Sequence, residues 1–172
     1  MNRVLELYTG KFLRLLRNAH WEYVERINSR GAGFIIARTE ADELVLVEQY
    51  RMPLQTRTIE LPAGIIGDED AHRDESVEAS ALRELEEETG FRGRSARVVF
   101  SGPTAPGMTA EMAYFVRVEG LQRVGPGGGV AGEDITVHVV PLAQLDAWLD
   151  ARQADGMLVD ARILAARQLL TR

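Results

Sequence analysis

Apolar and polar positions alternate at the start of the chain, as they do in half-buried strands. The segments VLELY (residues 4–8) and WEYVERI (residues 21–27) follow this pattern and have a polar turn between them. Residues 33–37 and 44–48 are instead short, continuous apolar runs, which are typical of strands covered on both faces. We therefore predict N-terminal strands within residues 1–28, followed by strands of a buried sheet.

The middle of the chain has the four-residue period of a helix. Val77, Ala81 and Leu85 recur on one face, and Gly90 is suited to ending the helix. The segment from Gly125 to Gly129 is the most flexible-looking part of the chain. Three further strands are expected at residues 94–99, 112–118 and 135–140, and two further helices at residues 142–152 and 159–170. Strands on both sides of a helix, with two helices after them, predict an α/β fold in which a mixed sheet is layered between helices.

Composition narrows the class of protein. A chain of 172 residues is long enough to form a single domain with a real core, spanning residues 1–172. The net charge of −6 argues against nonspecific nucleic-acid binding, and the absence of cysteine excludes disulfides and a thiol nucleophile. We find neither a signal peptide nor an apolar run of about 20 residues, the length of a membrane span. The expectation is a soluble, cytoplasmic protein.

Three glutamates of the central helix are spaced so that they lie near one another on its surface. At about 100° per residue, Glu84 and Glu88 lie about 40° apart, and Glu87 lies within about 60° of Glu84. Like charges at this spacing repel each other, and a bound cation would remove the repulsion. Magnesium prefers oxygen ligands of this kind. Taken alone, however, such a triplet is more typical of a solvated acidic helix face.

The wider spacing changes this interpretation. Glu75, seven further residues and then the run Arg83-Glu-Leu-Glu-Glu-Glu-Thr-Gly-Phe91 resemble the Nudix box, the signature of hydrolases of nucleoside diphosphates linked to another moiety. The family pattern opens with a glycine where this chain has Glu69. The nearest glycines are Gly64 and Gly67, so the loop from Gly64 to Glu75 resembles the family loop with an insertion of about five residues.

Segments outside the box resemble the ADP-ribose pyrophosphatase group, which overlaps in sequence with hydrolases of other nucleoside diphosphate sugars. Pro106 lies sixteen residues after Gly90, a spacing associated with ADP-ribose hydrolysis. The segments are ELPAG (60–64), APGMTAE (105–111), EDITVHVV (133–140) and DGMLVDA (155–161). The resemblance implies an α/β/α sandwich with an N-terminal antiparallel β region.

The resemblance also implies a metal site. Glu84, Glu87 and Glu88 would hold Mg²⁺, with Mn²⁺ as a possible substitute, together with the carbonyl of Ala63. Glu75 would mainly orient Arg83 and the preceding loop.

Substrate-binding and catalytic residues are implied as well. Arg51, which leaves the end of a buried strand, would contact the diphosphate, although an arginine there is usually part of a surface ion pair. Met108 and Glu111 would line the terminal ribose pocket. Trp21 and Glu22 would stack on and hydrogen-bond the adenine; a half-buried strand position is the alternative for Trp21.

The catalytic candidates are Glu133 and Glu87. Glu133 would be the general base or position the attacking water, although an ordinary loop acid is the simpler interpretation without the resemblance. The neighbouring Asp134 is an alternative base, and His138 is more typical of a structural strand residue.

The expected reaction is hydrolysis of ADP-ribose to AMP and ribose 5-phosphate. Another nucleoside diphosphate sugar, such as GDP-mannose, is the alternative substrate, and a nucleotide sensor without catalysis is a third interpretation. Related enzymes are dimers whose N-terminal strands complete the partner's base pocket, so a homodimer is expected here and residues 1–28 are its candidate dimerisation element.

Overall fold

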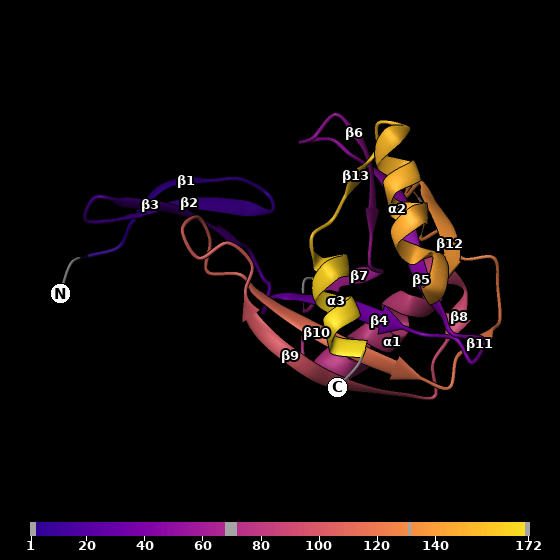
Figure 1. Ribbon diagram of the computed structural model, residues 1–172. Helices are drawn as coiled ribbons and strands as arrows, with labels where there is room; N and C mark the ends of the chain where they lie inside the picture. Colours follow the sequence, from indigo (N-terminus) through magenta and orange to yellow (C-terminus); the bar gives the residue numbers. More distant parts are fainter. Residues whose placement is uncertain (1–2, 68–71, 131, 171–172) are drawn as a thin grey trace.

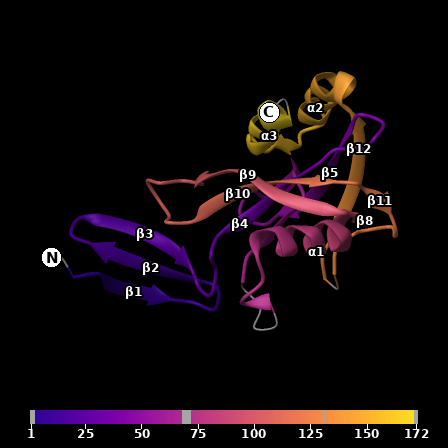
Figure 2. The same cartoon turned by 90° about the horizontal axis from the view of Figure 1, so that it is seen from below.

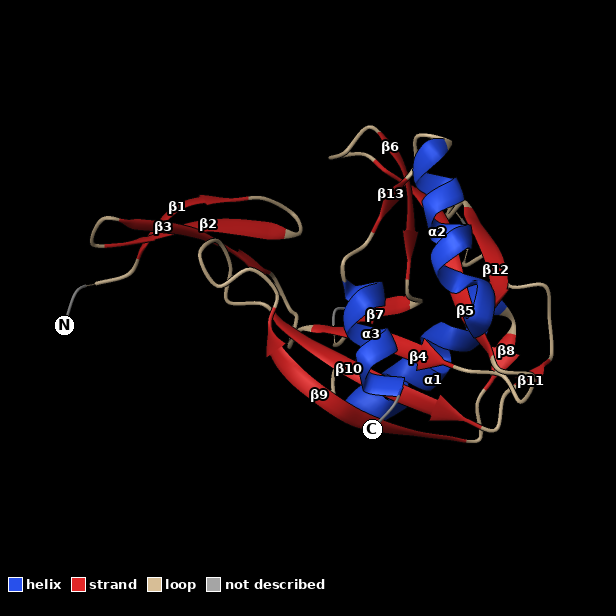
Figure 3. Cartoon of the chain, viewed as in Figure 1, coloured by secondary structure: helices blue, strands red, loops and turns tan. Residues whose placement is uncertain are grey.

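The computed structural model describes residues 3–67, 72–130 and 132–170. The N-terminal strands form a separate antiparallel sheet that projects from the rest of the chain, as expected from the alternating pattern (Figure 1). Figure 3 shows these strands without a helix over them. Of the apolar side chains in the sheet, Leu16 is buried, whereas Tyr8 and Trp21 are exposed. In sheet order, the strands are β1 (Leu5–Thr9), β2 (Leu13–Asn18) and β3 (Trp21–Arg26).

The first sheet of the main body is mixed. β10 pairs with β4 in parallel, whereas its other strand pairs are antiparallel. Every residue of β4 is buried, which confirms the prediction of a strand covered on both faces. In sheet order, the strands are β7 (Ala63–Ile65), β4 (Ala32–Ala37), β10 (Met112–Glu119) and β9 (Ser95–Pro103).

A second mixed sheet carries the other predicted strands. β13 pairs with β6 in parallel, and the remaining pairs are antiparallel. In sheet order, the strands are β12 (Ile135–Pro141), β5 (Glu43–Arg51), β6 (Thr56–Glu60) and β13 (Leu158–Val159). A short ribbon is formed by β8 (Phe91–Arg92) and β11 (Gln122–Arg123).

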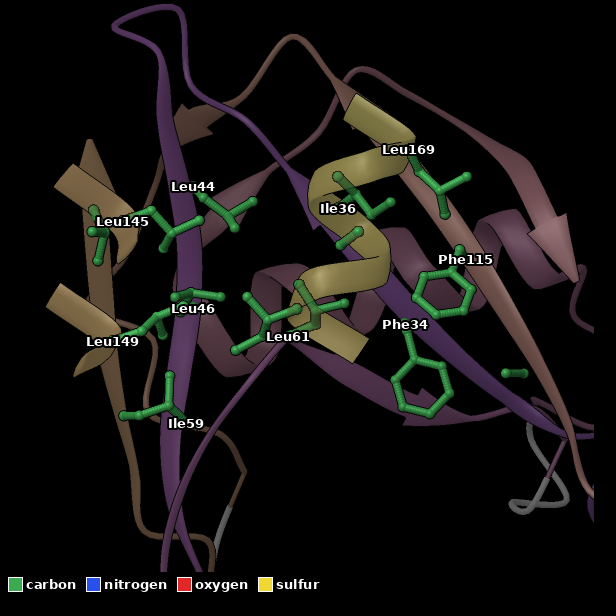
Figure 4. Packing of buried hydrophobic residues seen from close by; sticks show 14 of the residues in the cluster. Phe34, Ile36, Leu44, Leu46, Ile59, Leu61, Phe115, Leu145, Leu149 and Leu169 are labelled. Carbon is green, nitrogen blue, oxygen red and sulfur yellow. The ribbon is translucent and has the colours of Figure 1, made fainter. Parts of the chain in front are cut away.

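Helices cover both faces of these sheets, as Figure 2 shows. Phe34 and Ile36 of β4 face the side of α2 and α3 and pack in one cluster with Leu149 (Figure 4). Ile35, between them, faces the opposite side and packs in a second cluster with Leu85 of α1. The predicted α/β/α sandwich is therefore confirmed. The helices are α1 (Val77–Thr89), the 3-10 helix η2 (Leu142–Gln144), α2 (Leu145–Ala154) and α3 (Arg162–Leu170).

Several boundaries differ from the predictions. The helix expected at 159–170 begins only at Arg162, because Val159 pairs with Ile59 in β13 and the Asp160 side chain accepts the backbone N–H of Arg162. The helix expected at 142–152 is a 3-10 turn followed by α2. The predicted insertion after Gly64 includes residues 68–71, which lie outside the described residues.

None of the helices in the described ranges has the length and apolar composition needed to cross a membrane. Location in the cytoplasm stays a prediction.

Candidate active site

A cavity of about 880 Å³ opens beside the second half of α1. Its walls come from α1, the β5–β6 hairpin, β7, the loop before β12 and the segment from β13 into α3. The lining includes seven of the predicted site residues and Arg83 of the predicted box: Arg51, Ala63, Arg83, Glu84, Glu87, Glu88, Glu111 and Glu133. Residues far apart in the sequence thus meet around one acidic helix face.

Two caps and one core residue fix the orientation of α1. The Ser76 side chain accepts the backbone N–H of Ala79 at the N-terminus, and Gly90 ends the helix in the left-handed conformation. Leu85 is fully buried in the core under α1 and is not part of the cavity lining. The burial of this apolar face is what directs the glutamates into the cavity.

Arg83 lies among the carboxylates of the predicted box. Its guanidinium is 3.0 Å from Glu84 Oε1, 2.9 Å from Glu87 Oε2 and 3.4 Å from Glu75 Oε2. The contact with Glu75 agrees with the role expected for that residue, which is to orient Arg83. Glu84 and Glu87, in turn, are ion-paired rather than simply solvated.

Glu88 is the most buried of the three glutamates. Its carboxylate accepts the backbone N–H of Ala63 at 3.0 Å. Burial, followed by the charges of Glu84 and Glu133, raises the pKa of Glu88 to about 8, against the opposing effects of the Ala63 N–H and Arg51. The direction of the shift shows that Arg51 and the Ala63 N–H do not compensate for the burial of this carboxyl group and for its neighbouring negative charges.

The donors suit a hard divalent cation in their chemistry. Glu84, Glu87, Glu88 and Glu133 present carboxylate oxygens to one cavity, and a cation would oppose the burial and the repulsion that together raise the pKa of Glu88. Among the described residues, no three acidic or histidine side chains are already grouped around a metal position. Two of the carboxylates, those of Glu84 and Glu87, are instead ion-paired with Arg83.

The loop before β12 carries Glu133. Its carboxylate lines the cavity and accepts the backbone N–H of Val130 at 2.9 Å. The preceding glycines, which look flexible in the sequence, are docked on the end of α1. The N–H of Gly128 donates to the Glu88 carbonyl at 2.8 Å, and that of Gly129 donates to the Glu87 carbonyl at 3.0 Å. Carbonyls at the end of a helix have no partner within the helix, and the loop supplies one.

Arg51 reaches the cavity from the end of β5, and its guanidinium donates to both oxygens of Glu60 at 2.7 Å. Glu60, which was not among the predicted site residues, is buried at the end of β6. Arg51 is therefore part of an ion pair, as is usual for an arginine at the end of a strand, but this pair lines the cavity. Because β6 was not predicted as a strand, nothing in the sequence placed Glu60 beside Arg51.

The predicted adenine-binding residues lie elsewhere. Trp21 and Glu22 begin β3 at the end of the N-terminal sheet farthest from the body, and Trp21 is 51% exposed (Figure 1). Trp21 is therefore neither part of the cavity of its own chain nor packed as a core residue. Met108 is also exposed and does not line the cavity, although its carbonyl accepts the N–H of Val24. Glu111 lines the cavity.

Besides Glu60, three further charged residues of the lining were not predicted. Arg26, from the end of β3, lies 3.0 Å from Glu111. Asp160 and Arg162, from the start of α3, form an ion pair, and the Arg162 guanidinium stacks 4.2 Å above the Phe34 ring. The sequence signal for the last pair is an aspartate two residues before an arginine at a helix start, a pattern that caps helices in general and says little about a site.

Comparison with known proteins identifies the family. The model of the NUDIX domain matches residues 28–160. The chain belongs to this family. The Nudix match includes all the residues that line the cavity except Arg26 and Arg162.

Three curated relatives of the chain have different names. The chain is 32% identical to a methanol dehydrogenase activator of Bacillus methanolicus, over 96% of this chain and 88% of that protein. It is 35% identical to an ADP-sugar pyrophosphatase of Mus musculus, over 84% of this chain and 71% of that protein. It is 30% identical to an ADP-ribose pyrophosphatase of Bacillus subtilis, over 67% of this chain and 63% of that protein.

A solved structure supports the fold. The crystal structure of an ADP compounds hydrolase superimposes with a TM-score of 0.74 at 20% identity, covering 98% of this chain and 90% of the other. At this identity the similarity concerns the fold alone. The family and the names of the curated relatives support the prediction that this Nudix chain is a hydrolase acting on pyrophosphate bonds.

Proposed function

We propose that this Nudix chain hydrolyses the diphosphate bond of ADP-ribose, giving AMP and ribose 5-phosphate in a magnesium-dependent reaction. The observation that carries the proposal is the convergence of Glu84, Glu87, Glu88 and Glu133 with Arg51 on one cavity. The names of the Bacillus subtilis and Mus musculus relatives favour an ADP-sugar over other diphosphates. A diphosphate repels nucleophiles, so its hydrolysis needs neutralising charge together with a proton acceptor.

The metal would be held by Glu84, Glu87 and Glu88 with the Ala63 carbonyl. Bound Mg²⁺, or Mn²⁺ in its place, supplies positive charge to the phosphate oxygens and lowers the pKa of water. For Glu84 and Glu87 to act as ligands, their ion pairs with Arg83 must open.

Arg51 would bind the diphosphate by exchanging one or both of its hydrogen bonds with Glu60 for phosphate oxygens. The guanidinium is suited to this because it binds carboxylate and phosphate in the same bidentate geometry.

Glu133 is the general base of the proposal. Its carboxylate lies in the cavity, where it would take a proton from the attacking water, with Glu87 as the second catalytic candidate. Asp134 is less suited to this role, because its carboxylate is engaged by Arg57 at 2.9 Å.

Adenine recognition and assembly are proposed together. Trp21 and Glu22 are too far along the N-terminal sheet to serve their own cavity, so they would bind adenine in the site of a second copy. Met108, with Glu111, would face the terminal ribose. The exposed apolar residues of the N-terminal sheet favour a homodimer, because a surface of this kind is typically covered by a partner. They are Val4, Leu5, Leu7, Tyr8, Phe12, Leu13 and Trp21.

The test is hydrolysis of a substrate panel with MgCl₂, followed by chromatography of the nucleotide products. The panel contains ADP-ribose, GDP-mannose, UDP-glucose, NADH and diadenosine polyphosphates. GDP-mannose is included because a GDP-mannose pyrophosphatase of an Enterobacter species is 34% identical over 66% of this chain and 61% of that protein. If GDP-mannose is hydrolysed fastest, it replaces ADP-ribose as the proposed substrate. If no compound of the panel is hydrolysed, the interpretation as a nucleotide sensor without catalysis is favoured.

A matched pair of variants tests the site itself. Glu88→Gln should reduce activity by about a thousandfold or more, as expected for loss of a charged group that acts on the transition state. Glu86→Gln is the control, because Glu86 lies on the same helix but pairs with Arg92 outside the cavity. Activity near the wild-type level in Glu88→Gln would show that the metal assignment is wrong.

A further inference from the structure

Two neighbouring acids in the loop before β12 have different environments. Glu133 lines the acidic cavity, whereas the Asp134 carboxylate is 2.9 Å from a guanidinium nitrogen of Arg57 on β6. Because the two residues are adjacent in the chain, the position of Asp134 restricts where Glu133 can lie. The contact between Asp134 and Arg57 joins residues 77 positions apart, so it ties the loop to the second sheet.

Arg57 is itself held in place from the sheet. Its guanidinium pairs with Glu48 of β5, a buried residue whose second oxygen lies 2.9 Å from Nε2 of His138 on β12. Burial opposes ionisation of Glu48, but hydrogen bonds from His138 and Arg57 keep its pKa below the ordinary value. The His138 ring packs against Trp148 of α2, with ring centroids 5.0 Å apart. Arg57 thus presents Asp134 with a cation whose position is set by two strands and a helix.

The opposite end of the loop is anchored on α1. The N–H groups of Gly128 and Gly129 donate to the carbonyls of Glu88 and Glu87. Glu133 therefore follows an attachment to the helix that bears the proposed metal ligands, and it directly precedes an attachment to the sheet.

We infer that Arg57, acting through Asp134, is a positioning residue that fixes Glu133 relative to the carboxylates of α1. The inference rests on the proposed role of Glu133 as general base. Neither Arg57 nor Asp134 touches the cavity. Their effect on the reaction is therefore indirect and comes from the geometry of the loop.

The size of the effect follows from the exposure of the pair. The Asp134 side chain is 79% exposed and that of Arg57 is 31% exposed, so the pair is a modest interaction at the surface. Loss of the contact should lower kcat by about fivefold at most, because an exposed or partly exposed ion pair changes an equilibrium by about this factor or less. KM for the nucleotide sugar and the magnesium concentration for half-maximal rate should not change, because neither binding site loses a group.

The experiment compares Asp134→Asn, Arg57→Gln and the double variant with the wild-type protein. Arg57→Lys is added because it retains a cation for Glu48 if Arg57→Gln does not fold. The controls are Arg38→Gln and Asp42→Asn, which break an exposed Arg–Asp ion pair of 2.6 Å outside the cavity. Two quantities are measured: steady-state kinetics with ADP-ribose and MgCl₂, and amide hydrogen exchange of peptides covering residues 127–134 in the metal-free protein.

The single variants should show faster exchange in this loop and a lower kcat, and the double variant should be no worse than Arg57→Gln alone, which already loses the contact with Asp134. The controls should match the wild-type protein. Asp134→Asn should also have no further effect on kcat once Glu133 is replaced by glutamine, because there is then no base to position.

Three results would overturn the inference: unchanged exchange in Asp134→Asn, faster exchange without a lower kcat, or an undiminished effect of Asp134→Asn in the Glu133→Gln background. Failure of the proposed function is a separate result, recognised by the absence of turnover in the wild-type protein. In that case, the exchange measurement still decides whether Arg57 holds the loop.

Discussion

Gly64→Ala is expected to lower activity by about a hundredfold without unfolding the protein. Gly64 lies in β7 opposite Gly33 of β4, and its backbone passes directly over the Glu84 side chain. A Cβ at position 64 would lie closer than 3.0 Å to Cγ, Cδ and Oε1 of Glu84. The added methyl group would therefore displace the side chain of Glu84, a proposed metal ligand, while the Glu84 carboxylate itself is retained.

The magnitude follows from the overlap. Carbon atoms in contact are most favourably spaced at about 3.5–4.0 Å, so the Glu84 side chain must move by about 1 Å or more. A displacement of about 1 Å in a catalytic site can lower the rate by about a hundredfold. We expect a loss of this size in kcat, together with a higher magnesium concentration for half-maximal activity. The cost in stability should be smaller, because the Glu84 side chain can rotate within an open cavity.

The assay is the rate of AMP formation from ADP-ribose across a magnesium titration, with the thermal midpoint measured in parallel. Gly33→Ala is the matched control. It adds the same methyl group on the neighbouring strand, where the nearest atom is the Gly64 carbonyl oxygen at 3.9 Å. Glu84→Ala combined with Gly64→Ala should be no less active than Glu84→Ala alone. Wild-type activity and magnesium dependence in folded Gly64→Ala would refute the placement of Glu84 at the metal.

Four further predictions concern charge and assembly. In metal-free protein, the Glu88 carboxyl, with its pKa raised to about 8, retains a proton that the unfolded chain loses above about 4.5, so stability should fall as pH rises from about 5 to 8; thermal unfolding in EDTA should show this slope in wild-type protein and lose it in Glu88→Gln. Glu133→Gln should lower kcat with little change in magnesium affinity, and a selective metal-binding defect would make Glu133 a ligand instead. Arg51→Lys should raise KM for ADP-ribose by about tenfold, because lysine cannot bind phosphate in bidentate fashion; an unchanged KM would remove Arg51 from the diphosphate site. Trp21→Ala should weaken substrate binding only if the protein is dimeric, which chromatographic mass and substrate titration together would decide.

Local patterns in the sequence were sufficient for the central elements of the fold. The period of Val77, Ala81 and Leu85 predicted α1, and the apolar runs predicted β4 and β5. Both predictions were possible because a buried face requires apolar residues at the spacing of its own helix or strand. The Nudix resemblance then brought together eight of the residues that line the cavity.

Features fixed by contacts between distant residues could not be predicted in this way. The apolar spacing of Val159 is that of the last helix, yet Val159 pairs with Ile59 of β6, which lies 100 residues earlier in the chain (159 − 59). The ion pair between Arg51 and Glu60 depends on the same unpredicted strand. Trp21 was assigned a ligand by resemblance, but only the direction of β3 shows that its own cavity is out of reach.

The glycines before Glu133 have a consequence for how this protein tolerates mutation. Gly127, Gly128 and Gly129 all have positive φ, and a Cβ at Gly127 would collide with the backbone of Thr89. A Cβ at Gly129 would collide with the Glu133 side chain. In a saturation scan scored by activity, this stretch should be as intolerant of substitution as the glutamates of α1. Substitutions in the glycine segment 127–129 would thus be selected against as strongly as substitutions in the Nudix box.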